Sequence, residues 1–143
     1  MAHENLGPQS VEDWYEVALE RHKDARAALE KKREVIAVYL AGYCIECLLK
    51  AFLKAQNWPW GTKRREGHNL AGLWKACRFR VRDLNDQAGH KTFFVEEWST
   101  DLRYESDLSE NRQAEALVKA AGQVKTWIER RLSSVSQKGR SRR

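Results

Sequence analysis

The segment at residues 35–53 constrains the fold more than any other part of this sequence. Residues 35–45 carry no charge, and apolar side chains continue as far as Leu53. A helix that is apolar on nearly every side lies at the centre of a bundle or spans a membrane. Glu46 and Lys50 lie inside the segment, and its uncharged part is shorter than the roughly 20 residues that a spanning helix needs. The segment therefore predicts a central buried helix and no association with a membrane.

An amphipathic helix is expected before this segment. Apolar residues recur at three- and four-residue steps between Val11 and Leu29, which is the spacing of one helix face. Ser10 followed by Asp13 resembles a capping box at the start of this helix. The charged run at 31–33 interrupts the apolar stripe without Gly or Pro. We place a turn there, with a single long helix as the alternative.

Three more helices are expected after the central one. Residues 57–68 contain one proline and two glycines and predict a long loop. Helical patterns follow over about residues 69–84 and from near 91 to 98. The clearest amphipathic pattern is in the last helix, where apolar residues recur from Leu117 to Leu132.

Composition favours one all-α domain. The 143 residues are close to the usual size of a single domain, helix formers dominate, and no sustained alternation predicts strands. With 42% hydrophobic residues, 8 Gly and 2 Pro, collagen-like, low-complexity and wholly disordered chains are excluded. We expect a compact up-and-down bundle of about five helices over residues 1–133 and a basic disordered tail at 134–143.

The cysteines and the N-terminus indicate a cytoplasmic protein. The 3 Cys are an odd number, and residues 1–10 lack the basic and apolar regions of a secretion signal. Free thiols are typical of a reducing compartment. Cys44 and Cys47 are spaced as Cys-x-x-Cys inside the apolar helix, and we interpret them as buried structural thiols, since a structural zinc needs four ligands. No metal and no other cofactor is expected.

The net charge of +6 is concentrated in two segments. Residues 61–91 carry 8 basic and 3 acidic side chains, and residues 134–143 carry 4 basic and no acidic ones. A cationic cluster just before a helix start favours binding of an anion, and neighbouring tryptophans can stack on bases. An ordinary solvated loop is the alternative. The cluster comprises Lys63, Arg64, Arg65 and His68, with Trp58 and Trp60 beside it and Arg78, Arg80 and Arg82 further along the chain.

The central helix carries a second candidate site. Gly42, Glu46 and Lys50 recur at four-residue steps and share one helix face. The simpler interpretation is a structural ion pair, because buried charges need partners. The functional interpretation is a groove in which Gly42 allows close approach and Arg103 and Tyr104 converge on a phosphate or nucleotide. The two can both hold if Arg103 is the partner of Glu46.

Residues 39–51, Tyr-Leu-Ala-Gly-Tyr-Cys-Ile-Glu-Cys-Leu-Leu-Lys-Ala, resemble the central-helix signature of HEPN domains. The resemblance covers roughly residues 14–132. HEPN domains are small helical nucleotide-binding and RNA-associated modules, so it implies a nucleotide- or RNA-binding homodimer that belongs to a prokaryotic toxin-antitoxin or defence pair. The implied partner is a nucleotidyltransferase or an antitoxin protein. Further landmarks in the same order are Gly67-His68-Asn69-Leu70, Trp98 with Asp101-Leu102-Arg103-Tyr104, and Trp127-Ile128.

An endoribonuclease is the enzymatic alternative. Many proteins that this sequence resembles cleave RNA without metal, using an arginine followed after four to six residues by a histidine. Here the arginines nearest before His68 leave gaps of three and two residues, and seven residues separate Arg82 from His90. A general acid or base must lie close to the charge-stabilising cation, so the sequence favours a binding module. The candidates for an enzymatic site are His68, His90 and Arg103, and a purely structural helical interaction protein is the second alternative.

Overall fold

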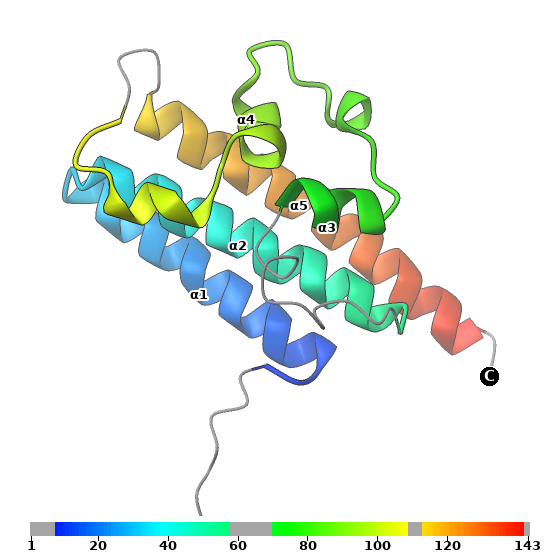
Figure 1. Cartoon of the computed structure of the whole chain (residues 1–143). Helices are drawn as coiled ribbons and strands as arrows, with labels where there is room; N and C mark the ends of the chain where they lie inside the picture. The colour runs from blue at the N-terminus through cyan, green and yellow to red at the C-terminus, as the bar shows by residue number, and fades with distance from the viewer. Residues whose placement is uncertain (1–7, 58–69, 109–112, 142–143) are drawn as a thin grey trace, which may run out of the picture.

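The structure is a computed structural model that describes residues 8–57, 70–108 and 113–141. Every regular element in these ranges is helical, which confirms the all-α prediction (Figure 1). In chain order the elements are α1 (Val11–Glu30), α2 (Glu34–Ala55), α3 (Leu70–Ala76), the 3-10 helix η2 (Val81–Leu84), α4 (His90–Glu96), the 3-10 helix η3 (Thr100–Tyr104) and α5 (Ala114–Ser141).

Helix α2 lies between α1 and α5 and contacts both along its length (Figure 1). Every residue from Cys44 to Leu53 is buried, so this part of the helix is covered on all sides. By length and composition α2 could cross a membrane, but 72% of its most apolar stretch is buried inside the molecule. The prediction of a central buried helix is confirmed.

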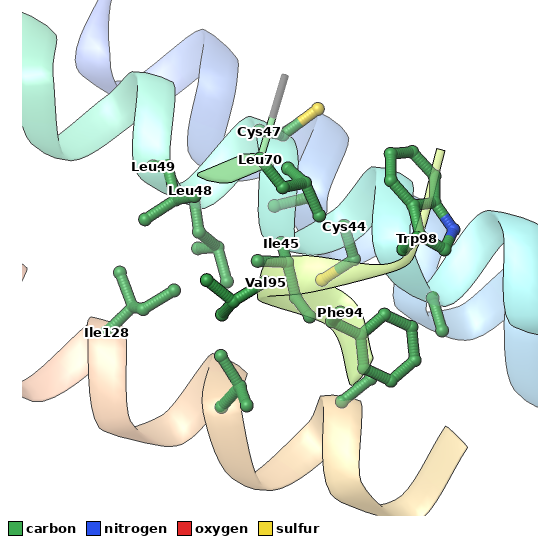
Figure 2. Close-up of a cluster of buried hydrophobic side chains, with 14 of the residues drawn as sticks. Cys44, Ile45, Cys47, Leu48, Leu49, Leu70, Phe94, Val95, Trp98 and Ile128 are labelled. Carbon is green, nitrogen blue, oxygen red and sulfur yellow. The ribbon is translucent and has the colours of Figure 1, made fainter. Parts of the chain in front are cut away.

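The short helix α4 closes the core over α2 and α5. Phe94 and Val95 of α4 belong to the same hydrophobic cluster as Ile45 of α2 and Ile128 of α5 (Figure 2). Phe94, Ile45 and Ile128 have no exposed surface. Burial of a side chain of this size stabilises a fold by about 1.5–3 kcal/mol, so this junction is a main source of stability.

Helix α1 begins with the predicted capping box. The backbone N–H of Asp13 donates to Ser10 Oγ at 3.0 Å, and the backbone N–H of Ser10 donates to Asp13 Oδ2 at 3.3 Å. These two bonds satisfy N–H groups that the first turn of a helix leaves without intrahelical partners. The prediction of the helix start is confirmed.

The turn predicted at residues 31–33 is also confirmed. Lys32 adopts a left-handed conformation with φ of 59°. The backbone N–H of Lys32 donates to Leu29 O, and that of Arg33 donates to Ala28 O, both at 2.9 Å. This pair of bonds is a Schellman motif, which ends α1 and directs the chain back along it.

Helix α3 is shorter than the pattern over residues 69–84 predicted. Arg78 has φ of 63°, and its backbone N–H donates to Lys75 O at 2.9 Å. The backbone N–H of Phe79 donates to Trp74 O at 3.2 Å, so a second Schellman motif ends the helix. The predicted helix is therefore divided into α3 and η2, joined by a turn at Arg78.

Helix α5 is longer than expected. It continues to Ser141, within the segment 134–143 for which the sequence led us to expect a tail. The segment contains no proline, and extending an existing helix costs much less than starting a new one.

Candidate nucleic-acid interface

Glu46 and Lys50 form a buried ion pair in α2. Lys50 Nζ lies 2.9 Å from Glu46 Oε2, and the side chains are 6% and 1% exposed, respectively. Lys50 Nζ also lies 5.0 Å from the centre of the Trp14 ring, which gives the ammonium a cation–π contact with α1. A ligand in solvent cannot reach groups buried to this degree. The geometry is that of a structural ion pair.

The indole ring of Trp98 occupies the space next to Gly42. A Cβ atom at this position would overlap the indole ring of Trp98, which packs directly on the helix backbone. The indole Nε1 of Trp98 donates to Val38 O at 3.2 Å, and the ring stacks on Tyr39 with centroids 6.0 Å apart. The absence of a side chain at Gly42 therefore makes room for Trp98, and the expected approach of a ligand to Gly42 is wrong.

Arg103 and Tyr104 lie at the surface on η3 and form what we call the Arg103–Tyr104 platform. Arg103 Nη2 donates to Tyr104 Oη at 3.1 Å, and its guanidinium carbon lies 4.8 Å from the centre of that ring. Hydrogen bonds to the hydroxyls of Tyr104 and then Tyr39 raise the pKa of Arg103. Tyr104 is 75% exposed. The platform is thus a preformed surface of one aromatic ring and one guanidinium.

The expected convergence of this platform with Glu46 and Lys50 is wrong. Arg103 reaches Tyr39, which precedes Glu46 by two helical turns, a separation of about 10 Å along α2. Tyr104 is exposed, whereas the ion pair is enclosed by α1. The two sets of residues therefore belong to different parts of the molecule.

An open groove of about 520 Å³ lies beside Arg103. Residues 32–36 form one wall, and Arg103 with residues 105–108 forms the other. Three basic and three acidic side chains line it, so its formal charge is zero. Ile36, which is 38% exposed, and Tyr104 are the large hydrophobic residues exposed in the described ranges, and both lie at this groove or next to it.

The remaining predicted candidates do not form one site. Lys63, Arg64, Arg65 and His68 lie outside the described residues. His90 begins α4 and lines a separate cleft of about 430 Å³ against α5. Because this cleft shares no residue with the groove beside Arg103, a catalytic pair of His90 and Arg103 within one chain is not formed.

The segment of residues 78–82, after α3, carries three exposed arginines. The sequence pattern predicted these residues only as part of a basic surface. Phe79 and Val81 pack against the core, whereas the three arginines that flank them are exposed. Phe79 is anchored between Phe52 and Trp127, with both ring centroids 4.8 Å from its own. The alternation of basic and apolar residues in Arg-Phe-Arg-Val-Arg is the signal for this arrangement. We call the exposed residues Arg78, Arg80 and Arg82 the arginine edge.

The three thiols are buried inside the bundle. Desolvation raises the pKa of Cys44, Cys47 and Cys77 well above the usual value, to about 12 for the last two. Cys77 Sγ donates to Leu49 O at 3.7 Å. A thiol with a raised pKa is a poor nucleophile and a poor metal ligand. In the described residues no group of three or more His, Cys, Asp or Glu could hold a metal ion.

Comparison with known proteins gives one result for this chain. The family model of the HEPN domain matches residues 11–131, which is most of the chain and includes α1 to α4 and the first part of α5. Among curated proteins and among solved structures, no match is found.

Proposed function

The chain belongs to the HEPN domain family, and from this we propose that it is a nucleotide- or RNA-binding and partner-binding helical module. The observation that carries the proposal is the Arg103–Tyr104 platform. Single-stranded RNA is recognised mainly by stacking of its bases on aromatic rings and guanidinium planes. Tyr104 offers one ring face of this kind, and Arg103 can pair with a phosphate beside a stacked base.

The platform is held in place before any ligand arrives. Arg103 Nη2 donates to Tyr104 Oη at 3.1 Å, and Tyr39, which raises the pKa of Arg103, stacks on the buried Trp98. Binding to a guanidinium that is already ordered costs less conformational entropy than binding to one whose side chain must first become ordered. This support favours a specific contact over general attraction to the cationic chain.

We also propose that the module is cytoplasmic and acts in a toxin-antitoxin or defence pair. Family membership and the three free thiols support this setting. The partner would be a small nucleotidyltransferase or an antitoxin protein. A neighbouring reading frame for such a protein is the observation that tests the pairing.

Substitution of Tyr104 by Ala should weaken binding of a 12-nucleotide single-stranded RNA between about fivefold and 100-fold, because one stacked base loses its platform. Tyr104→Phe should retain most of the affinity, since it keeps the ring and loses only the hydroxyl. Fluorescence anisotropy at fixed salt measures both effects. Equal affinity of Tyr104→Ala and the unchanged protein would contradict the proposal, and no RNA binding at all would favour the purely structural alternative.

The same samples test the enzymatic alternative. The RNA recovered after binding without added metal should be intact, both with the unchanged protein and with Arg103→Ala. Cleavage that disappears in Arg103→Ala would replace the binding module with a metal-independent endoribonuclease that uses a rearranged site.

We further propose that the chain forms a homodimer, as the family suggests. Sedimentation equilibrium at tens of micromolar should then give twice the mass of 16.7 kDa, because a stable interface has a Kd below roughly this concentration. A monomer under these conditions would contradict the proposal. The same measurement with Tyr104→Ala shows whether the platform contributes to the interface.

A further inference from the structure

The arginine edge and one wall of the cleft beside His90 belong to one stretch of chain, residues 78–91, and share no residue with the Arg103–Tyr104 platform. We propose that this cleft, which we call the amide cleft, holds one base of a single-stranded RNA while the arginine edge binds the adjoining phosphates. The inference rests on the proposed function, because it assumes that RNA is the ligand. It uses none of the residues of the platform, so the two can be tested separately.

The amide cleft has the size of a small-ligand site. Its volume is about 430 Å³, within the range of roughly 300–1,000 Å³ that is usual for such sites. Residues 85–88, His90 and Lys91 form one wall and α5 forms the other. On the α5 side, Ala116 and Ala120 have small side chains and leave space for a flat ligand.

Two charged residues of the cleft are used to hold its wall in shape. The carboxylate of Asp86 accepts from the backbone N–H groups of Lys91 at 3.1 Å and Thr92 at 2.7 Å, which fixes the start of α4. Lys91 Nζ donates to Leu84 O at 2.9 Å and to Asn85 O at 3.2 Å. The segment that leads into α4 is thus tied down at both ends by side chains of the cleft itself.

The other polar side chains of the cleft are suited to a nucleobase. Asn85, Gln87 and Gln123 each offer an amide with donor and acceptor groups, which match the mixed edges of a base. His90 adds an aromatic ring, and Lys119 adds a positive charge. A lining of amides with one ring and little acidic charge favours a base over a bare phosphate.

The arginine edge leads directly into this cleft. Only Asp83 and Leu84 separate Arg82 from Asn85, and η2 packs against α4. Because Phe79 and Val81 are partly buried and pack against the core, the exposed Arg78, Arg80 and Arg82 that alternate with them lie on the solvent side of the segment. Guanidinium groups neutralise phosphates along a strand. The arginine edge supplies three of them, whereas the groove beside Arg103 has a formal charge of zero.

The two surfaces lie on different sides of the molecule around α4. In Figure 1 the segment between α3 and α4 lies above and to the right of α4, and η3 lies to its left, near the start of α2. A nucleotide bound at the platform alone would leave the edge and the cleft unoccupied. Contacts at both places require a strand of several nucleotides, so the ligand is a polynucleotide.

The experiment compares variants of the full chain, the first two of them matched in charge, for binding to a 12-nucleotide single-stranded RNA over a range of salt concentrations. R78Q/R80Q/R82Q removes the arginine edge, and K23Q/R26Q/K31Q removes three exposed cations from α1 and its end, on the other side of α2. K138Q/R140Q/R142Q/R143Q removes the charge of the C-terminal segment. Thermal unfolding of each variant shows that the fold is retained.

R78Q/R80Q/R82Q should weaken binding more than tenfold near 0.1 M salt and reduce the slope of log Kd against log salt by about 2, since each phosphate contact to a single strand contributes about 0.7. K23Q/R26Q/K31Q should leave the slope nearly unchanged. Q87A/Q123A should leave the slope unchanged but reduce the differences in affinity among four homopolymeric RNAs, because the base-reading amides are lost.

Four outcomes would overturn the proposed role of the amide cleft and the arginine edge. If the edge variant and the α1 variant weaken binding equally, the attraction is nonspecific. If only the C-terminal variant flattens the salt dependence, the affinity belongs to that segment. If Tyr104→Ala weakens binding while R78Q/R80Q/R82Q does not, the amide cleft is excluded and the proposed function remains. If the unchanged protein does not bind RNA, both proposals are excluded.

Discussion

Replacement of Lys50 by Met should lower the free energy of unfolding by about 3–5 kcal/mol, because it removes the ammonium 2.9 Å from a carboxylate that is 1% exposed. A charge inside a bundle is stable only when it is paired, and water cannot solvate Glu46 without opening the contact between α1 and α2. Glu46→Leu should be destabilising for the same reason, since it leaves the ammonium of Lys50 enclosed. Chemical denaturation measures the effect, which corresponds to a decrease in Tm of roughly 10–20 °C.

The double variant Glu46→Leu/Lys50→Met separates pairing from packing. Replacement of a buried ion pair by apolar residues of similar volume is often neutral, so the double variant should be more stable than either single one. Lys23→Met is the matched control, because Lys23 and Glu20 are 71% and 58% exposed and their pair lies 3.5 Å apart. It should change stability by less than about 0.5 kcal/mol. Single variants as stable as the control, with RNA binding lost, would show that Glu46 and Lys50 serve a ligand.

The parts of the fold that the sequence predicted are those in which neighbours along the chain determine the outcome. The central helix follows from a segment that is apolar on every side, and the capping box from Ser10 and Asp13. The ion pair follows from four-residue spacing in an apolar helix. In each case the interacting residues lie on one helix, so spacing alone places them together.

The end of α3 was harder to predict because no glycine marks it. Lys32, Asn57 and Arg78 adopt φ of 59°, 58° and 63° at or just after the ends of α1, α2 and α3. A left-handed conformation costs a residue with a side chain roughly 1–2 kcal/mol, and the contacts of the whole bundle must supply it. The pattern over residues 69–84 therefore predicts one helix, although the chain turns at Arg78.

The candidate site depended on contacts between distant segments. Trp98 comes to rest on Gly42 although 55 residues separate them in the chain, and nothing near Gly42 indicates this partner. The guanidinium of Arg103 likewise pairs with Tyr104, its neighbour in the chain, and not with Glu46. The arginine edge is easier to predict from the sequence, because the alternation of arginines with Phe79 and Val81 already separates an inner face from an outer one.

Substitution of Gly42 by Ala should destabilise the protein by about 3 kcal/mol or more, because the new Cβ would overlap the indole of Trp98. The ring cannot shift easily, since its Nε1 donates to Val38 O and its face stacks on Tyr39. The indole must therefore leave a site in which it is only 6% exposed, and loss of a large buried aromatic costs about 3–5 kcal/mol. Chemical denaturation and a red shift of tryptophan fluorescence would report the displacement.

Gly122→Ala is the matched control for this prediction, because it is the same substitution in a helix with different surroundings. A Cβ at Gly122 would lie 3.4 Å from His22 Cε1, an ordinary van der Waals distance. Ala exceeds Gly in helix propensity by about 1 kcal/mol, so this variant should be slightly more stable than the unchanged protein. In a Trp98→Ala background, Gly42→Ala should cost little, because the ring that it overlaps is gone. Equal effects of Gly42→Ala with and without Trp98 would show that the two residues do not interact, and that Gly42 is free to receive another group.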